Sequence, residues 1–303
     1  MVEIRRVLCP VDTSPTSRRA IEHAVTLAGW YDARLTVLHV WNPPYLPQPP
    51  ILFAEREHSM LQAASDGPGE AEAFVQDQVA SARAAGIECE GVIERSHNPA
   101  DRILHCADTL PADLIVLGTH GRRGFERVML GSVAERVLRK AQCPVLTVPP
   151  PATFKATKLP FKRLLCPVDF SEPSLAAVRF ALSIAKESGA HVTLLHAIEW
   201  PTDDDAFTSI MLASPEVRGQ LEDQIIDRLD ALVLPEDRTW CDPAARVTEG
   251  KAYRRIVEFA ETDETDLIVM GVHGRNPVDV MLFGSTTNQT VRRAPCPVLT
   301  MRR

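Results

Sequence analysis

Short apolar runs and longer amphipathic segments alternate along the first half of the chain. Four apolar runs and a weaker one at residues 90–94 predict buried strands, the four being Val7–Val11, Leu35–Val40, Leu114–Leu117 and Val145–Val148. Apolar residues at helical spacing occupy the segments between them, at residues 15–28, 70–84, 99–107 and 132–141. Ser14 and Pro15 predict the start of the first helix, because serine caps helices and proline suits their first position.

The same order of elements recurs in the second half, where Ser171 is the expected cap of the first helix. Arg6–Asp12 recurs as Arg163–Asp169, 157 residues later, and Cys143–Thr147 recurs as Cys296–Thr300, 153 residues later. Two homologous halves are therefore expected. We expect one domain at residues 1–150, a proline-bearing linker at 151–160 and a second domain at 161–303.

Alternation of strands and helices predicts an α/β fold in each half, with a parallel sheet covered by helices on both faces. In such sheets, ligands bind outside the carboxyl ends of the strands. The residues that follow the first and fourth strands of each half are therefore the candidates for a binding site.

A glycine pattern follows the fourth strand in both halves. Gly118 and Gly121 precede Gly131 and Ser132, with nine residues between Gly121 and Gly131, and the second half repeats this spacing with Gly271, Gly274, Gly284 and Ser285. Because glycine lacks a Cβ, it lets the backbone turn sharply and lets a ligand approach the backbone N–H groups. The Gly-Ser pair that ends each pattern opens a predicted helix, whose N-terminal amides suit phosphate.

An aspartate ends the first strand of each half, Asp12 in the first and Asp169 in the second. If the first and fourth strands lie side by side, each carboxylate would face the glycine loop. A carboxylate beside phosphates suggests contact with Mg²⁺ or with a ribose hydroxyl. The alternative is that these aspartates cap the first helix, a role for which Ser14 and Ser171 compete.

The glycine pattern, the Pro-Val-Asp end of the first strand and the Cys-Pro-Val-Leu-Thr final strand resemble the ATP-binding subgroup of the universal stress protein family. The resemblance covers nearly the whole chain, twice. It implies two tandem Rossmann-like domains, similar to adenine nucleotide alpha hydrolases, each with five parallel strands in the order 3-2-1-4-5. It also implies ATP with Mg²⁺ in each half.

The resemblance assigns residues to each site by position. Adenine would lie against Val11 and Val40, with Asp12 near the ribose or the metal. The ribose and phosphates would contact Gly118, His120, Gly121, Arg122, Gly131, Ser132 and Val133. The second site would use Val168, Asp169, Ala197, Gly271, His273, Gly274, Arg275, Gly284, Ser285 and Thr286.

The second half departs from the first inside its glycine loop, where Asn276 replaces Arg123 and Pro277 replaces Gly124. The motif glycines are kept, so two sites are still expected. The histidines within the motif are expected to contribute backbone rather than imidazole chemistry. His39 and His196, which end buried strands, are expected to be structural.

Three functions compete. The first is an ATP-binding stress-response regulator or nucleotide sensor. The second is a slow ATPase or nucleotidyl-transfer enzyme of related fold, which the lack of a Gly-x-x-x-x-Gly-Lys-Ser/Thr loop disfavours. The third is a nucleotide-free interaction scaffold, in which the glycines shape turns and Ser132 caps its own helix.

Composition limits the partners. The 303 residues carry a net charge of −7, which argues against general nucleic-acid binding. Seven cysteines without a Cys-x-x-Cys pair favour reduced thiols and a cytoplasmic protein. No apolar run is long enough to predict a membrane span. The apolar final strands, at residues 145–148 and 298–301, suggest an internal pseudo-dimer and leave a homodimer through the same strands open.

Overall fold

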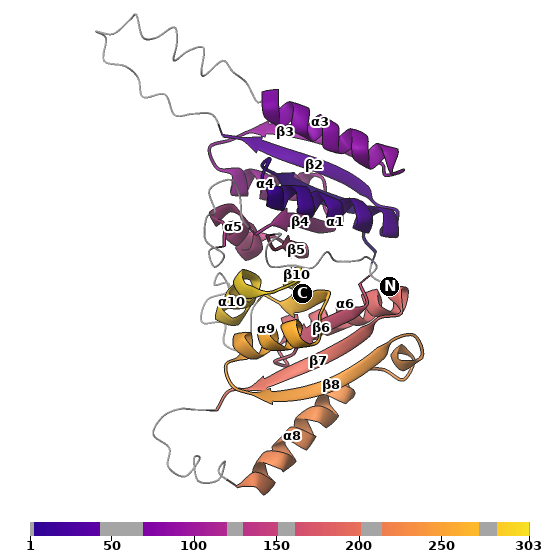
Figure 1. Cartoon of the computed structure of the whole chain (residues 1–303), viewed down its shortest axis with the longest axis vertical. Helices are drawn as coiled ribbons and strands as arrows, with labels where there is room; N and C mark the ends of the chain where they lie inside the picture. The colour runs from indigo at the N-terminus through magenta and orange to yellow at the C-terminus, as the bar shows by residue number, and fades with distance from the viewer. Residues whose placement is uncertain are drawn as a thin grey trace, which may run out of the picture.

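The computed structural model describes residues 3–42, 69–119, 130–150, 161–200, 214–272 and 284–302 (Figure 1). The expected linker, 151–160, lies outside this part. Elements of the first half are β1 (Arg6–Val11), α1 (Pro15–Tyr31), β2 (Arg34–Trp41), α3 (Gly69–Ala84), β3 (Cys89–Arg95), α4 (Pro99–Thr109), β4 (Leu114–Gly118), α5 (Ser132–Lys140) and β5 (Val145–Val148).

The second half repeats this order with one added turn of 3₁₀ helix, η2, before its third strand. Its elements are β6 (Arg163–Pro167), α6 (Glu172–Ser188), β7 (His191–Ile198), α8 (Pro215–Asp230), η2 (Asp237–Thr239), β8 (Asp242–Glu249), α9 (Ala252–Thr262), β9 (Leu267–Gly271), α10 (Ser285–Arg293) and β10 (Val298–Met301). The strands and helices predicted from the apolar pattern are confirmed.

All ten strands form one sheet, in the order β3-β2-β1-β4-β5-β10-β9-β6-β7-β8. Each half therefore has the expected order 3-2-1-4-5 with parallel neighbours. The halves join where β5 pairs antiparallel with β10, with Leu146 opposite Leu299. Thr147 and Thr300 strengthen this junction, because each hydroxyl donates to a carbonyl of the opposite strand.

Helices cover both faces of the sheet, and each face has one apolar core that runs through both halves. Helices α1, α3, α6 and α8 bury their apolar sides on one face, and α4, α5, α9 and α10 on the other (Figure 1). A salt bridge of 3.7 Å between Arg292 of α10 and Glu135 of α5 also crosses the junction.

Local signals start the first helix of each half where the sequence predicts. The hydroxyl of Ser14 accepts a hydrogen bond from the N–H of Ser17, and that of Ser171 accepts one from Ser174. Both helices end at a left-handed residue, which is Asp32 in one half and Gly189 in the other. The serine caps at the helix starts lie in the strand-to-helix turn that follows each aspartate.

All seven cysteines are free thiols, and six of them are buried. Within the described ranges, no helix combines the length and apolar character that a bilayer crossing requires.

Candidate functional site

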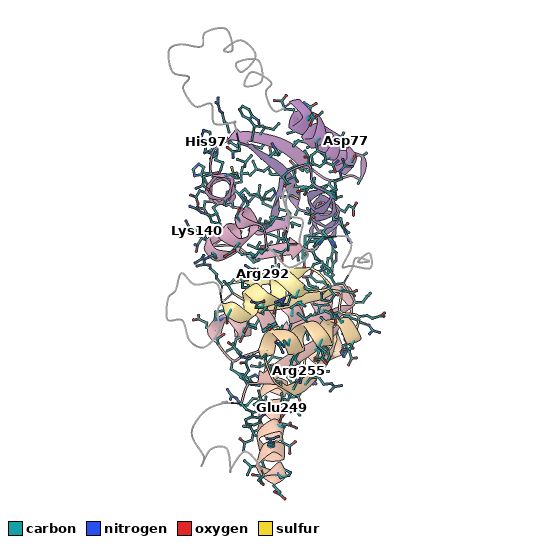
Figure 2. All side chains as sticks on the ribbon, turned by 60° about the vertical axis from the view of Figure 1, so that its left-hand side comes forward. Asp77, His97, Lys140, Glu249, Arg255 and Arg292 are labelled. Atoms are coloured by element: carbon teal, nitrogen blue, oxygen red, sulfur yellow. The ribbon has the colours of Figure 1, made fainter. Side chains whose placement is uncertain are left out.

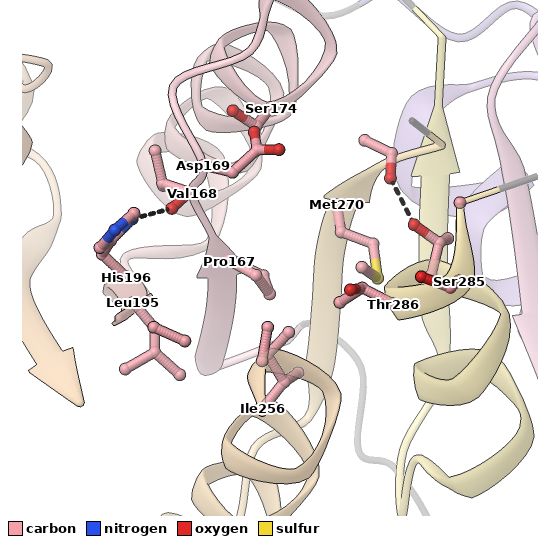
Figure 3. A pocket seen from close by; sticks show the side chains of 15 residues that line it. Pro167, Val168, Asp169, Ser174, Leu195, His196, Ile256, Met270, Ser285 and Thr286 are labelled. Atoms are coloured by element: carbon pink, nitrogen blue, oxygen red, sulfur yellow. Dashed lines mark hydrogen bonds between the residues drawn. The ribbon is translucent and has the colours of Figure 1, made fainter. Parts of the chain in front are cut away.

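A cleft of about 280 Å³ opens in the second half at the carboxyl ends of β6, β7 and β9 (Figure 3). Its apolar part is formed by Leu195, Ile256 and Met270, and its polar part includes Asp169 and Ser285. Figure 3 shows Val168 and Asp169 on one side of Met270, and Ser285 and Thr286 on the other. This is the position where ligands bind in open parallel sheets.

Seven of the ten residues predicted for the second site line this cleft. They are Val168, Asp169, Ala197, Gly271, Gly284, Ser285 and Thr286. The other three, His273, Gly274 and Arg275, lie outside the described residues, as do His120, Gly121 and Arg122 of the first half. Residues that lie far apart in the sequence therefore meet around one space.

The described residues of the first half occupy equivalent places. Val11 ends β1 and Asp12 follows it, Val168 and Asp169 follow β6, and Val40 lies near the end of β2 as Ala197 does on β7. Gly131, Ser132 and Val133 open α5 with the same graded exposure as Gly284, Ser285 and Thr286 at α10. The described site residues therefore occupy equivalent backbone positions in both halves, and Val40 of the first half corresponds to Ala197 of the second.

Each aspartate is tied to the start of the following helix. Oδ1 of Asp12 accepts hydrogen bonds from the hydroxyl of Ser17 (2.6 Å) and the N–H of Ser14 (3.2 Å). Oδ1 of Asp169 accepts from the N–H (3.0 Å) and the hydroxyl (2.5 Å) of Ser171. The serines cap the helices, and the aspartates hold the capping serines.

The residue after each aspartate adopts a left-handed backbone. Thr13 has a φ of 61° and Phe170 a φ of 63°. This conformation costs a β-branched or bulky side chain free energy, of order 1–3 kcal/mol, and persists only where the surroundings fix it. The turn that presents Asp12 and Asp169 to the sheet edge is therefore built in the same strained way twice.

The glycines at the ends of β4 and β9 also serve helix packing, a role that the sequence did not predict. A Cβ on Gly118 would lie 2.7 Å from Cγ2 of Thr16, and one on Gly271 would lie 2.8 Å from Cβ of Pro173. Thr16 and Pro173 belong to the first turns of α1 and α6. Glycine is needed here because a helix presses on the strand end, although Gly271 also lines the cleft.

The third glycine of each motif is the N-cap of a helix, Gly131 for α5 and Gly284 for α10. No side chain caps either helix in the described part of the chain, so Ser132 is the first helical residue and not a cap. Among the described residues, the backbone N–H groups of Ser285 and Thr286 have no hydrogen-bond acceptor. Helix starts of this kind suit an anion.

In each half, one histidine of the second strand is hydrogen-bonded to the backbone at the end of the first strand, as expected for a structural residue. Nδ1 of His39 lies 2.8 Å from the carbonyl oxygen of Val11, and Nδ1 of His196 lies 2.6 Å from that of Val168 (Figure 3). A carbonyl only accepts, so each Nδ1 carries the proton and donates. His196 also lines the cleft.

Sequence reasoning missed several residues that line the cleft. Thr287 is buried and donates from its hydroxyl to the carbonyl of Gly271 at 2.9 Å, and Ser174 lies opposite on α6. Ser174 lies three positions after the predicted cap Ser171, which is about one helical turn, and this spacing could have indicated it. Ala252 and Ile256 come from α9, whose contact with the cleft no local pattern indicates.

The chain is similar in sequence to known proteins of one family. Residues 3–149 and 160–302 each match the profile described as the universal stress protein family. Universal stress protein Rv2005c of Mycobacterium tuberculosis is 26% identical over 98% of this chain and 96% of its own length. Universal stress protein MJ0531 of Methanocaldococcus jannaschii is 34% identical over 48% of this chain and 83% of its own.

A solved structure supports the fold. The crystal structure of a universal stress protein from Archaeoglobus fulgidus has a TM-score of 0.67, with 23% identity and 98% of each chain covered. This likeness concerns the architecture. Because the family profile matches nearly the entire sequence, once in each half, the chain belongs to the universal stress protein family as a tandem member.

Proposed function

We propose that each half of this protein binds ATP in its cleft, and that the protein acts as a stress-response regulator that senses adenine nucleotide. The observation that carries the proposal is the convergence of seven predicted residues on one cleft in the second half. Family membership supports it for both halves.

The chemistry of the cleft suits the parts of a nucleotide. The apolar side chains of Leu195, Ile256 and Met270 offer a surface for a flat base. Ser285 and Thr286 begin α10, where the helix dipole and unpaired N–H groups favour phosphate oxygens. The phosphates of the proposed ATP would accordingly lie toward α10.

Mg²⁺ would reach the cleft with the phosphates. It binds phosphate groups together with one or two carboxylates and several waters. Asp169 supplies one carboxylate to the cleft of the second half, and Asp12 has the equivalent position after β1 in the first half, which fits this mode. Among the described residues, no group of three acidic, histidine or cysteine side chains would hold an ion without the nucleotide.

A regulator also needs a structure that nucleotide can bias. We propose that the two halves form an internal pseudo-dimer, which the pairing of β5 with β10 supports. That pairing leaves β5 between β4 and β10, so a homodimer through the final strands would require contacts other than strand pairing. ATP shifts such an assembly only if it binds one arrangement more tightly than another.

The test adds a negative charge where the phosphates are expected. Ser285→Asp places a carboxylate at the first position of α10, on an exposed residue. Aspartate there favours the helix, so a loss of binding would not reflect unfolding. We expect calorimetry of the nucleotide-stripped protein with Mg²⁺ to show two ATP sites, one of them weakened about tenfold or more in the variant.

Matched variants make the result specific. Ser132→Asp should weaken the other site, and the double variant should lose both. Gln76→Glu adds the same charge to the exposed face of α3 and should change neither. Unaltered ATP binding in the double variant, or no ATP binding by the wild-type protein, would refute the proposal.

A further inference from the structure

Helices α9 and α10 carry a compact positive surface beside the cleft of the second half. We call it the Tyr253 cluster: Lys251, Tyr253, Arg254 and Arg293. The guanidinium carbons of Arg254 and Arg293 lie 5.8 and 5.6 Å from the centre of the Tyr253 ring. Nε of Arg254 donates to the phenol oxygen at 3.0 Å. The three cations are exposed, and Tyr253 is half-buried.

The positive charges of the cluster affect the pKa of its tyrosine. The pKa of Tyr253 is lowered, first by the hydrogen bond from Arg254 and then by the charges of Arg254, Arg293 and Lys251. The two arginines also lie over the ring at distances typical of cation–π contacts. The side chains are thus held around one point of the surface.

The first half provides an internal comparison, because α4 and α5 occupy the places of α9 and α10 at a constant separation of 153 residues. There, Asp101 of α4 forms ion pairs with Arg136 (2.7 Å) and Lys140 (3.7 Å) of α5. The equivalents of these three residues are Arg254, Gln289 and Arg293. The acid that joins the two helices in the first half is replaced by an arginine, and this arginine and Arg293 both lie near the Tyr253 ring.

This reversal brings no evident gain in stability. Like charges that lie close together repel each other. Among the described residues, no carboxylate lies within 4.0 Å of Lys251, Arg254 or Arg293.

The nearby acids are engaged elsewhere. Glu258 pairs with Arg255 at 2.7 Å, and Glu199 accepts from the N–H of Ala252 at 2.7 Å. In a protein of net charge −7, three cations without an acidic partner form a site prepared for an external anion.

We propose that the Tyr253 cluster binds an oligophosphate, at a site separate from the cleft. Guanidinium groups match phosphate oxygens in pairs, and a tyrosine hydroxyl adds a donor beside them. Successive phosphate groups carry adjacent charges, as the three cations do. Ala252 lines the cleft and lies between Lys251 and Tyr253, so the site adjoins the mouth of the cleft.

The experiment titrates tripolyphosphate into the full chain by calorimetry, with ATP present at saturating concentration. We expect wild-type protein to bind it. Arg254→Asp restores the charge pattern of the first half, opposite Arg293, and should weaken binding about tenfold or more. Arg293→Gln is a second variant that removes one cation without adding an acid, and it should weaken binding as well.

Controls decide whether the cluster is responsible. Arg246→Asp makes the same change of charge at an exposed position on β8 and should leave binding unaltered. Equal losses in Arg254→Asp and Arg246→Asp would overturn the proposal, since general charge would then explain the effect. Displacement of tripolyphosphate by ATP, or equal affinity for citrate, would also overturn it.

Discussion

Replacing Gly271 by alanine tests whether the end of β9 and the start of α6 are packed as closely as the structure indicates. The added Cβ would lie 2.8 Å from Cβ of Pro173, 2.9 Å from its carbonyl carbon and 3.0 Å from the nitrogen of Ser174. Two of these three atoms belong to the backbone, so no rotation of a side chain relieves the contact. Either the first turn of α6 or the end of β9 must move.

The cost follows from this geometry. Adding one carbon to a closely packed site destabilises proteins by about 1–3 kcal/mol, and rigid neighbours place Gly271→Ala in the upper part of that range. Gly118→Ala should cost less, because its nearest contact is the Cγ2 methyl of Thr16 at 2.7 Å and the nearest backbone atom lies at 3.2 Å. Typical domains are stable by about 5–15 kcal/mol, so both variants should fold.

The assay is urea unfolding followed by circular dichroism, with Gly219→Ala as the control. Gly219 lies inside α8, and a Cβ there would meet nothing within 4 Å. The control should stabilise the protein by about 0.5–1 kcal/mol, because alanine favours helix over glycine. If Gly271→Ala were neutral or stabilising, or if Gly118→Ala cost more than Gly271→Ala, the packing argument would fail.

Gly271→Ala also bears on the cleft. Gly271 lines it, its carbonyl accepts from Thr287, and α6 begins beside Asp169. A shift of either element would move groups on which the proposed second ATP site depends. We expect ATP affinity to fall at one of two sites, with the first site unaltered.

Two further predictions concern stability. Burial lowers the pKa of His23 from 6.5 to about 4, and the positive charge of Arg19 contributes to this shift. Below pH 6.5, His23 therefore binds a proton in the unfolded chain but stays neutral in the folded chain until the pH approaches 4. Stability should fall by about 2 kcal/mol between pH 7 and pH 5. His23→Gln should flatten this dependence in urea unfolding, and an unchanged slope would contradict the assignment. Asp266 accepts from the N–H groups of Lys162 (2.8 Å) and Arg163 (2.9 Å) at the start of β6. Asp266→Ala should cost about 1–2 kcal/mol in the same assay, and a change below about 0.3 kcal/mol would show that water replaces the carboxylate.

The strands, the helices and their duplication were predictable from the sequence, because burial on both faces of a parallel sheet leaves continuous apolar runs. Ser14 and Ser171 were predictable as caps for a local reason: serine caps helix starts, and a proline follows each of these serines within two residues. The candidate site was predictable from the glycine spacing and the two aspartates, since the ends of parallel strands meet at one edge.

Contacts between distant segments were decided only by the tertiary structure. The contribution of Ala252 and Ile256 to the cleft follows from how α9 crosses the sheet, and no local signal records it. Gly271 is glycine because Pro173 presses on it from another element, whereas the sequence alone suggested room for a ligand. The difference between Asp101 and Arg254 is visible in the sequence, but only the fold shows that Arg254 and Arg293 both lie near the Tyr253 ring. Periodicity and caps are local and survive in a linear sequence, whereas packing and charge depend on which surfaces meet in space.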